Sequence, residues 1–144
     1  MGGPALSTRR RDFPPPYLLD THVWFWYLTG SPRLPAGFRR RIEGALTELW
    51  LSPISVWELG MLDARGRIRL SPGFRPWVVE AFEHLPLEQA PINHEVALVS
   101  RELELQHRDP ADRFLLATAR VFDLTLLTVD RRLLAVPGVR VLGP

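Results

Sequence analysis

Short apolar runs alternate with helical patterns along most of this chain, and this alternation limits the folds that it can adopt. Residues 17–19, 50–54, 87–92, 124–129 and 139–142 are typical of buried strands. Helical patterns lie between them, at residues 23–28, 35–49, 55–64, 76–84, 94–103, from 110 onwards, and at 131–135. Strands joined by helices require parallel pairing through right-handed crossovers. We therefore predict a three-layer α/β/α domain with a mostly parallel central sheet of four to five strands.

The length and composition predict a single globular domain. The chain has 144 residues, of which 46% are hydrophobic and 24% are charged. Residues 1–16 are rich in Arg and Pro and have no periodic pattern, so we expect a disordered N-terminal extension before a domain at residues 17–144. No apolar run approaches the roughly 18 residues that span a bilayer, and we expect a cytoplasmic protein without membrane contact.

The absence of two residue types excludes several kinds of chemistry. There is no Cys, which excludes disulfides, thiolate zinc sites and Cys nucleophiles, and the four His residues have no metal-ligand spacing. All 18 basic residues are Arg, so Schiff-base chemistry and a P-loop lysine are also excluded. The formal net charge of +2 permits a polyanionic partner, for which Arg side chains are suited. Chemistry in this chain must depend on oxygen ligands or hydroxyl groups.

Acidic residues stand where predicted strands end and helices begin. Asp20 and Asp130 follow two strands that we expect to be neighbours, and the functional crevice of a parallel sheet lies at this edge. Glu58, in a predicted capping box with Ser55, and Asp112 belong to the first turns of helices that flank the same edge. Each acid could simply cap a helix. Their conjunction favours a shared site.

A shared acidic site predicts a divalent cation. Carboxylates several ångströms apart repel by about 1 kcal/mol or more per pair at an effective dielectric near 20, and a hard cation relieves this cost. Oxygen-only ligands in an incomplete cage suit Mg²⁺ or Mn²⁺, which can take further ligands from phosphate. This donor set predicts metal-assisted hydrolysis of phosphodiester bonds.

Four ordered motifs resemble a known family. They read L-L-D-T-H-V-W-F-W, S-P-I-S-V-W-E-L-G-M-L, H-R-D-P-A-D-R-F-L-L-A-T-A and L-L-T-V-D, and together they resemble a PIN domain of the VapC toxin type over residues 17–143. The resemblance implies a Mg²⁺-dependent endoribonuclease that acts on single-stranded RNA and is held inactive by a cognate VapB-like antitoxin. By motif position the family's four acids correspond to Asp20, Glu58, Asp112 and Asp130, and Asp112 is preferred to Asp109 because it directly precedes the apolar part of its helix.

Within this hypothesis Asp20 and Asp112 bind the principal metal, and Glu58 and Asp130 complete the ring. Hydroxyls next to strand ends can orient carboxylates or simply bond to local backbone. Arg113 can pair with a neighbouring carboxylate, which we favour, or with RNA phosphate. The supporting candidates are thus Thr21, Thr128, Asp109 and Arg113.

A basic loop offers candidates for RNA binding, namely Arg65, Arg67 and Arg69, although a solvated loop would have the same composition. The dense aromatic surface of residues 24–27 predicts an interface, and we expect a homodimer. The main alternative function is a catalytically inactive PIN-like module that binds a partner or RNA. A phosphoacceptor receiver would also use a strand-end Asp, but the chain lacks the lysine of that class.

Overall fold

The central sheet is fully parallel and has five strands. The computed structural model describes residues 13–106 and 109–144. The strands are β1 (Tyr17–Leu19), β2 (Leu49–Leu51), β3 (Glu88–Gln89), β4 (Thr125–Leu127) and β5 (Arg140–Leu142). They pair in the order β3-β2-β1-β4-β5, and every neighbouring pair is parallel. The predicted sheet is confirmed, and β1 and β4 are neighbours as expected.

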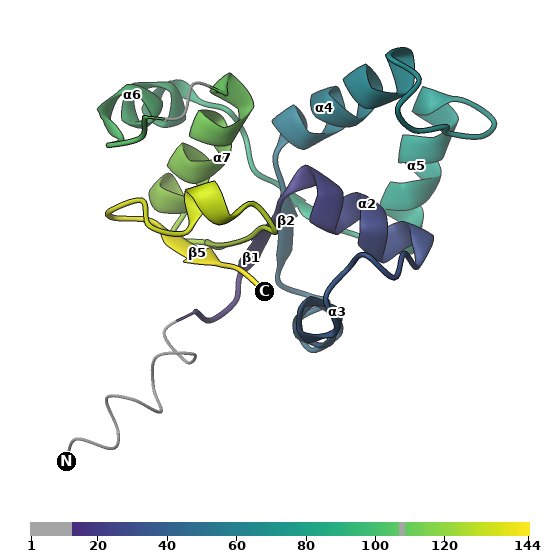
Figure 1. Ribbon diagram of the computed structural model, residues 1–144, viewed down its shortest axis with the longest axis horizontal. Coiled ribbons are helices and arrows are strands. Elements are labelled where there is room, and N and C mark those ends of the chain that lie inside the picture. Colours follow the sequence, from purple (N-terminus) through teal and green to yellow (C-terminus); the bar gives the residue numbers. More distant parts are fainter. Residues whose placement is uncertain (1–12, 107–108) are drawn as a thin grey trace.

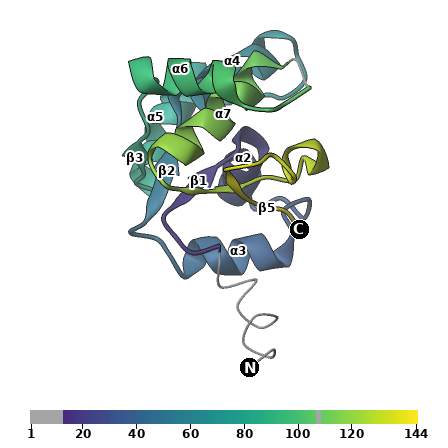
Figure 2. The ribbon, with the colours of Figure 1, turned by 90° about the vertical axis from the view of Figure 1, so that its left-hand side faces the viewer.

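Helices cover both faces of this sheet, which confirms the three-layer prediction. They are α2 (Thr21–Thr29), α3 (Ala36–Glu43), α4 (Pro53–Ala64), α5 (Phe74–His84), α6 (His94–Glu102), α7 (Pro110–Val121) and a short 3₁₀ helix, η1 (Arg131–Leu133). Figure 1 shows α6 and α7 on one side of the sheet and α2, α3 and α5 on the other. Figure 2 shows the strands lying between α7 and α3. Within the described residues, no helix has the length and apolarity that a bilayer crossing requires.

The strand side chains alternate between two separate cores. Leu19 and Leu127 belong to the core beneath α2, α3 and α5, whereas Leu18 and Leu126 belong to the core beneath α6 and α7. All four are 0% exposed. Successive side chains of a strand point to opposite faces, so a sheet covered on both faces needs apolar residues at every position. This requirement explains the continuous apolar runs in the sequence.

Several predicted helix boundaries were wrong, including the start of α5 at Phe74 instead of residue 76 and the end of η1 at Leu133 instead of residue 135. The first helix begins at Thr21, not at residue 23, because the Asp20 side chain caps it. The second helix ends at Glu43 and not at 49, because the chain turns at Gly44 before it enters β2. The third begins at Pro53 and not at 55, and Ser52 is its cap. A Pro at the first helical position loses no hydrogen bond, because that N–H would have no intrahelical partner.

The chain just before β1 is attached to the sheet. The Pro14 carbonyl accepts a hydrogen bond of 2.8 Å from the Thr125 hydroxyl, and the Pro16 carbonyl accepts one of 3.0 Å from the Thr125 amide. Residues 13–16 of the predicted N-terminal extension, residues 1–16, thus belong to the described part of the chain. Residues 1–12 lie outside the described residues.

Candidate active site

The ends of β1 and β4 bring the first and fourth acids to one edge of the sheet. Leu19 and Leu127 are paired in register, and the Asp20 amide donates to the Leu127 carbonyl at 3.0 Å. Asp20 directly follows β1, and Asp130 lies shortly after β4, where it caps η1. The two carboxylates repel each other, which contributes to the raised pKa of Asp20. The sheet topology alone thus gathers these two acids.

Both carboxylate oxygens of Asp20 accept hydrogen bonds. Oδ1 accepts from the Thr21 amide at 2.7 Å, which caps α2, and Oδ2 accepts from the buried Thr128 hydroxyl at 2.5 Å. Burial raises the pKa of Asp20 above its ordinary value, whereas these two hydrogen bonds lower it. The Thr128 hydroxyl also accepts from the Asp130 amide at 3.0 Å. Thr128 therefore links the two acids.

Glu58 reaches the same site from the second turn of α4. Its Oε1 accepts a hydrogen bond of 2.6 Å from the buried Thr21 hydroxyl. The pKa of Glu58 is raised to about 7, first by burial and then by the negative charges of Asp20, Asp109 and Asp112, while the hydrogen bond from Thr21 lowers it. The predicted capping box was wrong, because the Ser52 side chain accepts from the Ile54 amide and caps the helix instead.

Asp109 and Asp112 occupy different positions at the start of α7. Asp109 is the cap, and its Oδ1 accepts from the Ala111 amide at 2.9 Å. Asp112 lies in the first turn and is only 7% exposed. The charges of both acids act on Glu58, so both lie beside the candidate site. Asp112 is buried, whereas Asp109 is only half-buried.

Arg113 does not pair as we expected. Its guanidinium donates to the main-chain carbonyls of Ser100 (2.9 Å) and Leu105 (2.6 Å), at the end of α6 and just beyond it. These bonds attach α7 to the segment before it. The favoured carboxylate pairing is thus replaced by two carbonyl contacts, because the side chain points away from the sheet edge toward the chain after α6.

Sequence reasoning missed Arg132. Its guanidinium forms a two-pronged ion pair with Asp130, with Nε to Oδ1 at 3.0 Å and Nη2 to Oδ2 at 2.7 Å, and its amide donates to Oδ1 at 3.0 Å. Asp130 thus caps η1 and holds a cation. In the sequence, the only indication of this ion pair is that Arg132 stands two residues after Asp130. An Arg at this distance from an acid is too common to predict a contact.

The donor set at this edge suits a hard divalent cation, although the side chains would have to adjust around it. Among residues 13–106 and 109–144, no three His, Asp or Glu side chains already lie close enough to hold a metal ion. The carboxylates nevertheless crowd one another, since three other acids raise the pKa of Glu58. Oxygen donors that repel one another are what a hard cation stabilises.

The three candidate RNA-binding arginines are all exposed, but only Arg65 lies beside the acids. It lines an open groove of ≈ 590 Å³ together with Thr21, Glu58 and Asp109. Arg67 and Arg69 follow in the loop after α4 and do not line this groove.

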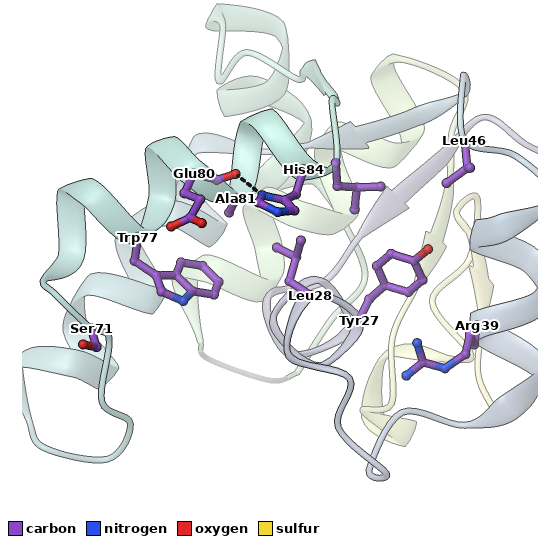
Figure 3. Close-up of a pocket in the computed structure, with 10 residues that line it drawn as sticks. Tyr27, Leu28, Arg39, Leu46, Ser71, Trp77, Glu80, Ala81 and His84 are labelled. Atoms are coloured by element: carbon purple, nitrogen blue, oxygen red, sulfur yellow. Dashed lines mark hydrogen bonds between the residues drawn. The ribbon is translucent and has the colours of Figure 1, made fainter.

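A second groove, of ≈ 560 Å³, lies away from the acids between α2, α3 and α5 (Figure 3). We call it the α2–α5 groove. Tyr27 and Leu28 line its floor, Trp77 and Leu46 lie along its sides, and none of the candidate acids is among its lining residues. The Arg39 guanidinium stands 5.4 Å from the centre of the Tyr27 ring. This groove has an aromatic, mixed-charge lining that suits a peptide segment better than a metal.

Comparison with known proteins gives consistent results. A family model described as PIN domain matches residues 17–139. Ribonuclease VapC22 of Mycobacterium tuberculosis is 36% identical over 117 residues, which cover 81% of this chain and 88% of that protein. The crystal structure of FitAcB from Neisseria gonorrhoeae aligns with a TM-score of 0.65 at 25% identity, over 89% of this chain and 97% of that chain. VapBC2 from Rickettsia felis, bound to promoter DNA, aligns with a TM-score of 0.69 at 15% identity, over 89% and 98% of the two chains. This last likeness concerns the fold alone.

Proposed function

The chain belongs to the PIN-domain family of VapC ribonucleases, and on that premise we propose that it is a metal-dependent endoribonuclease and the toxin of a toxin-antitoxin pair. One observation carries the proposal. Glu58 is half-buried at the sheet edge, and its pKa is raised to about 7 by burial first and by the negative charges of Asp20, Asp109 and Asp112 in addition. Such crowding of acids disfavours the charged state of Glu58 and favours binding of a cation.

We propose that Asp20 and Asp112 hold Mg²⁺ or Mn²⁺, with Glu58 and Asp130 completing the acidic ring. When bound, the ion supplies a more acidic water and neutralises negative charge at the phosphate. The Thr128 hydroxyl fixes Asp20 and the Thr21 hydroxyl fixes Glu58, at 2.5 and 2.6 Å. Their role is to keep these carboxylates pointed at the edge of the sheet. Hydrolysis of one phosphodiester bond at such a site divides a single-stranded RNA into two shorter fragments.

The substrate in this proposal is single-stranded RNA, and we propose that the protein acts in the cytoplasm. Arg65 supplies positive charge in the groove beside the acids, and the exposed Arg67 and Arg69 follow it in the loop after α4. Phosphate contacts of this kind position a nucleic acid but do not read its sequence. The three arginines, Arg65, Arg67 and Arg69, are therefore proposed to hold the strand across the site.

The proposed partner is a VapB-like antitoxin, and the α2–α5 groove is the surface that we propose for it. The solved structures that share this fold include a toxin-antitoxin complex from Klebsiella pneumoniae. The groove carries half-buried aromatic side chains, Tyr27 and Trp77, beside Leu46, which is 49% exposed. Aromatic anchors of this type dominate many protein interfaces. A homodimer remains part of the proposal, since exposed apolar side chains also lie outside this groove, for example Val79 at 50% exposure.

The deciding experiment is cleavage of a labelled single-stranded RNA with Mg²⁺, with EDTA, and with Mg²⁺ restored. We expect cleavage that EDTA stops and Mg²⁺ restores. The Asp20→Asn and Asp112→Asn variants should lose this activity while their circular dichroism spectra stay unchanged, because Asn is nearly isosteric with Asp. The exposed Glu83→Gln on α5 is the matched control and should retain activity. RNA binding without cleavage by the wild type would instead support the inactive binding module.

A further inference from the structure

The groove beside the acids contains an exposed tryptophan that the proposed chemistry does not use. Trp57 directly precedes Glu58 on α4 and lines the ≈ 590 Å³ groove together with Glu58, Asp109 and Arg65. Its exposed fraction is 57%. The helix packs inward through Ser55 and Leu59, which are both 0% exposed. Each lies two residues from Trp57, which is about 200° around a helix, so Trp57 points away from the core.

Trp57 differs from the other four tryptophans of the chain. Trp24, Trp26, Trp50 and Trp77 are each buried or half-buried and each forms an aromatic ring pair. Trp57 belongs to none of the ring pairs found among the described residues. A large planar side chain is thus held on a rigid helix with much of its surface open to the groove. Neither burial nor ring packing accounts for it.

We infer that Trp57 is a stacking platform for an unpaired base of the RNA substrate, next to the phosphate at the acidic ring. The inference rests on the proposed function. Base stacking on an aromatic ring contributes about 1–3 kcal/mol per base and tolerates any base. It requires a single strand, since a base inside a duplex has no free face. Trp57 therefore selects for unpaired RNA and not for a particular sequence.

The order of side chains along α4 fits a single strand of RNA in the groove. Glu58 belongs to the acidic ring, Trp57 stands beside it, Met61 follows one turn on, and Arg65 ends the helix. Trp57 and Arg65 are separated by eight residues, or about 12 Å of helix rise. A single strand presents phosphate, base and phosphate in the same succession. A second protein copy on this groove would instead bury Glu58 and Asp109 away from water without a compensating cation.

The test compares Trp57→Ala and Trp57→Phe with Leu98→Ala, which truncates an equally exposed apolar side chain on α6. A labelled seven-nucleotide RNA is titrated in EDTA, where metal-dependent cleavage stops, and kinetics are measured in Mg²⁺. We expect Trp57→Ala to raise the Kd and the KM about 5- to 150-fold with kcat nearly unchanged. Trp57→Phe should retain most of the affinity but lose the quenching of tryptophan fluorescence by RNA. Leu98→Ala should behave as the wild type.

Three outcomes would overturn the inference. The first is an unchanged Kd and KM in Trp57→Ala. The second is a changed oligomeric state of Trp57→Ala with unchanged RNA affinity, which would assign the groove to a second copy. The third is equal loss of affinity for single-stranded and fully paired RNA. If the wild type binds RNA through Trp57 but does not cleave it, the inference holds and the proposed nuclease activity fails.

Discussion

Replacing Glu58 by Gln should make the metal-free protein more stable while it removes activity. The pKa of Glu58 is raised from its ordinary 4.5 to about 7, first by burial and then by neighbouring acids. The folded protein therefore holds a proton that the unfolded chain has released between these two pH values. Stability falls as the pH rises through this window and stays lower above pH 7. Gln keeps an oxygen acceptor for the Thr21 hydroxyl and removes the charge.

The magnitude follows from the pKa. At about 1.36 kcal/mol for each pH unit, the change from 4.5 to about 7 sets an upper limit of about 3 kcal/mol. Because the side chain is only half-buried, solvent screening reduces this to about 1–2 kcal/mol. We expect the free energies of unfolding of wild type and Glu58→Gln to agree near pH 4. Above pH 7 the variant should be more stable by that amount.

Urea unfolding in EDTA at several pH values from 4 to 8 measures this difference. Glu83→Gln on α5 is the matched control, since it removes an exposed carboxylate from a helix and should leave the pH dependence unchanged. Addition of Mg²⁺ should stabilise the wild type more than Glu58→Gln, because bound metal stabilises the folded state by mass action. Equal stability of the two proteins at every pH would refute the crowding of charge at the sheet edge.

Three further predictions concern the surroundings of the acids. Thr128→Val should lower kcat/KM for RNA about 10-fold or more while Thr128→Ser retains activity, because only the hydroxyl is bonded to Asp20; equal rates would exclude an orienting role. Arg67→Ala combined with Arg69→Ala should weaken RNA binding and reduce the slope of log Kd against log salt concentration. An unchanged slope would exclude a role of this loop in RNA binding. Ser55→Ala should keep full activity and raise the unfolding free energy by up to about 1 kcal/mol, because the buried Ser55 hydroxyl has no hydrogen-bond partner among the described residues; loss of stability in a thermal melt would contradict this.

The sheet could be predicted because its information is local. The apolar runs of β1, β2 and β4 mark largely buried strands, and the acids that follow β1 and β4 mark the edge of the sheet. The run predicted at residues 87–92 contains only the short, exposed strand β3. The neighbouring positions of Asp20 and Asp130 follow from the parallel order of β1 and β4. The carboxyl ends of parallel strands lie at one edge of the sheet, so acids that follow two such strands share that edge.

The start of α4 shows where local patterns become ambiguous. Ser52 and Ser55 are both good helix caps, and Ser55 also has an acid three residues later. Pro53 decides between them, because Pro is favoured directly after a cap and its ring fixes a helical φ. The error mattered for function, because a capping role for Glu58 would have occupied its carboxylate at the helix end.

The contacts of the arginines could not be predicted, because they depend on tertiary placement. Arg113 donates to two carbonyls near the end of α6, which the order of residues does not reveal. Arg132 pairs with Asp130 through the particular turn of η1. Long, flexible side chains find partners only once the elements are packed, so their targets are the last feature that a sequence specifies.

The two explanations for the acids, helix capping and metal binding, separate most clearly at Glu58. Asp20, Asp109 and Asp130 each cap a helix, so their positions have a structural reason whether or not the site binds a metal. Glu58 caps nothing, because Ser52 does so, yet it is placed half-buried among other acids with its pKa raised to about 7. Its single described hydrogen bond, from Thr21, offsets only part of that cost. A chain that had only to fold would be more stable with Gln there, so the carboxylate at this position argues for a cation in the working protein.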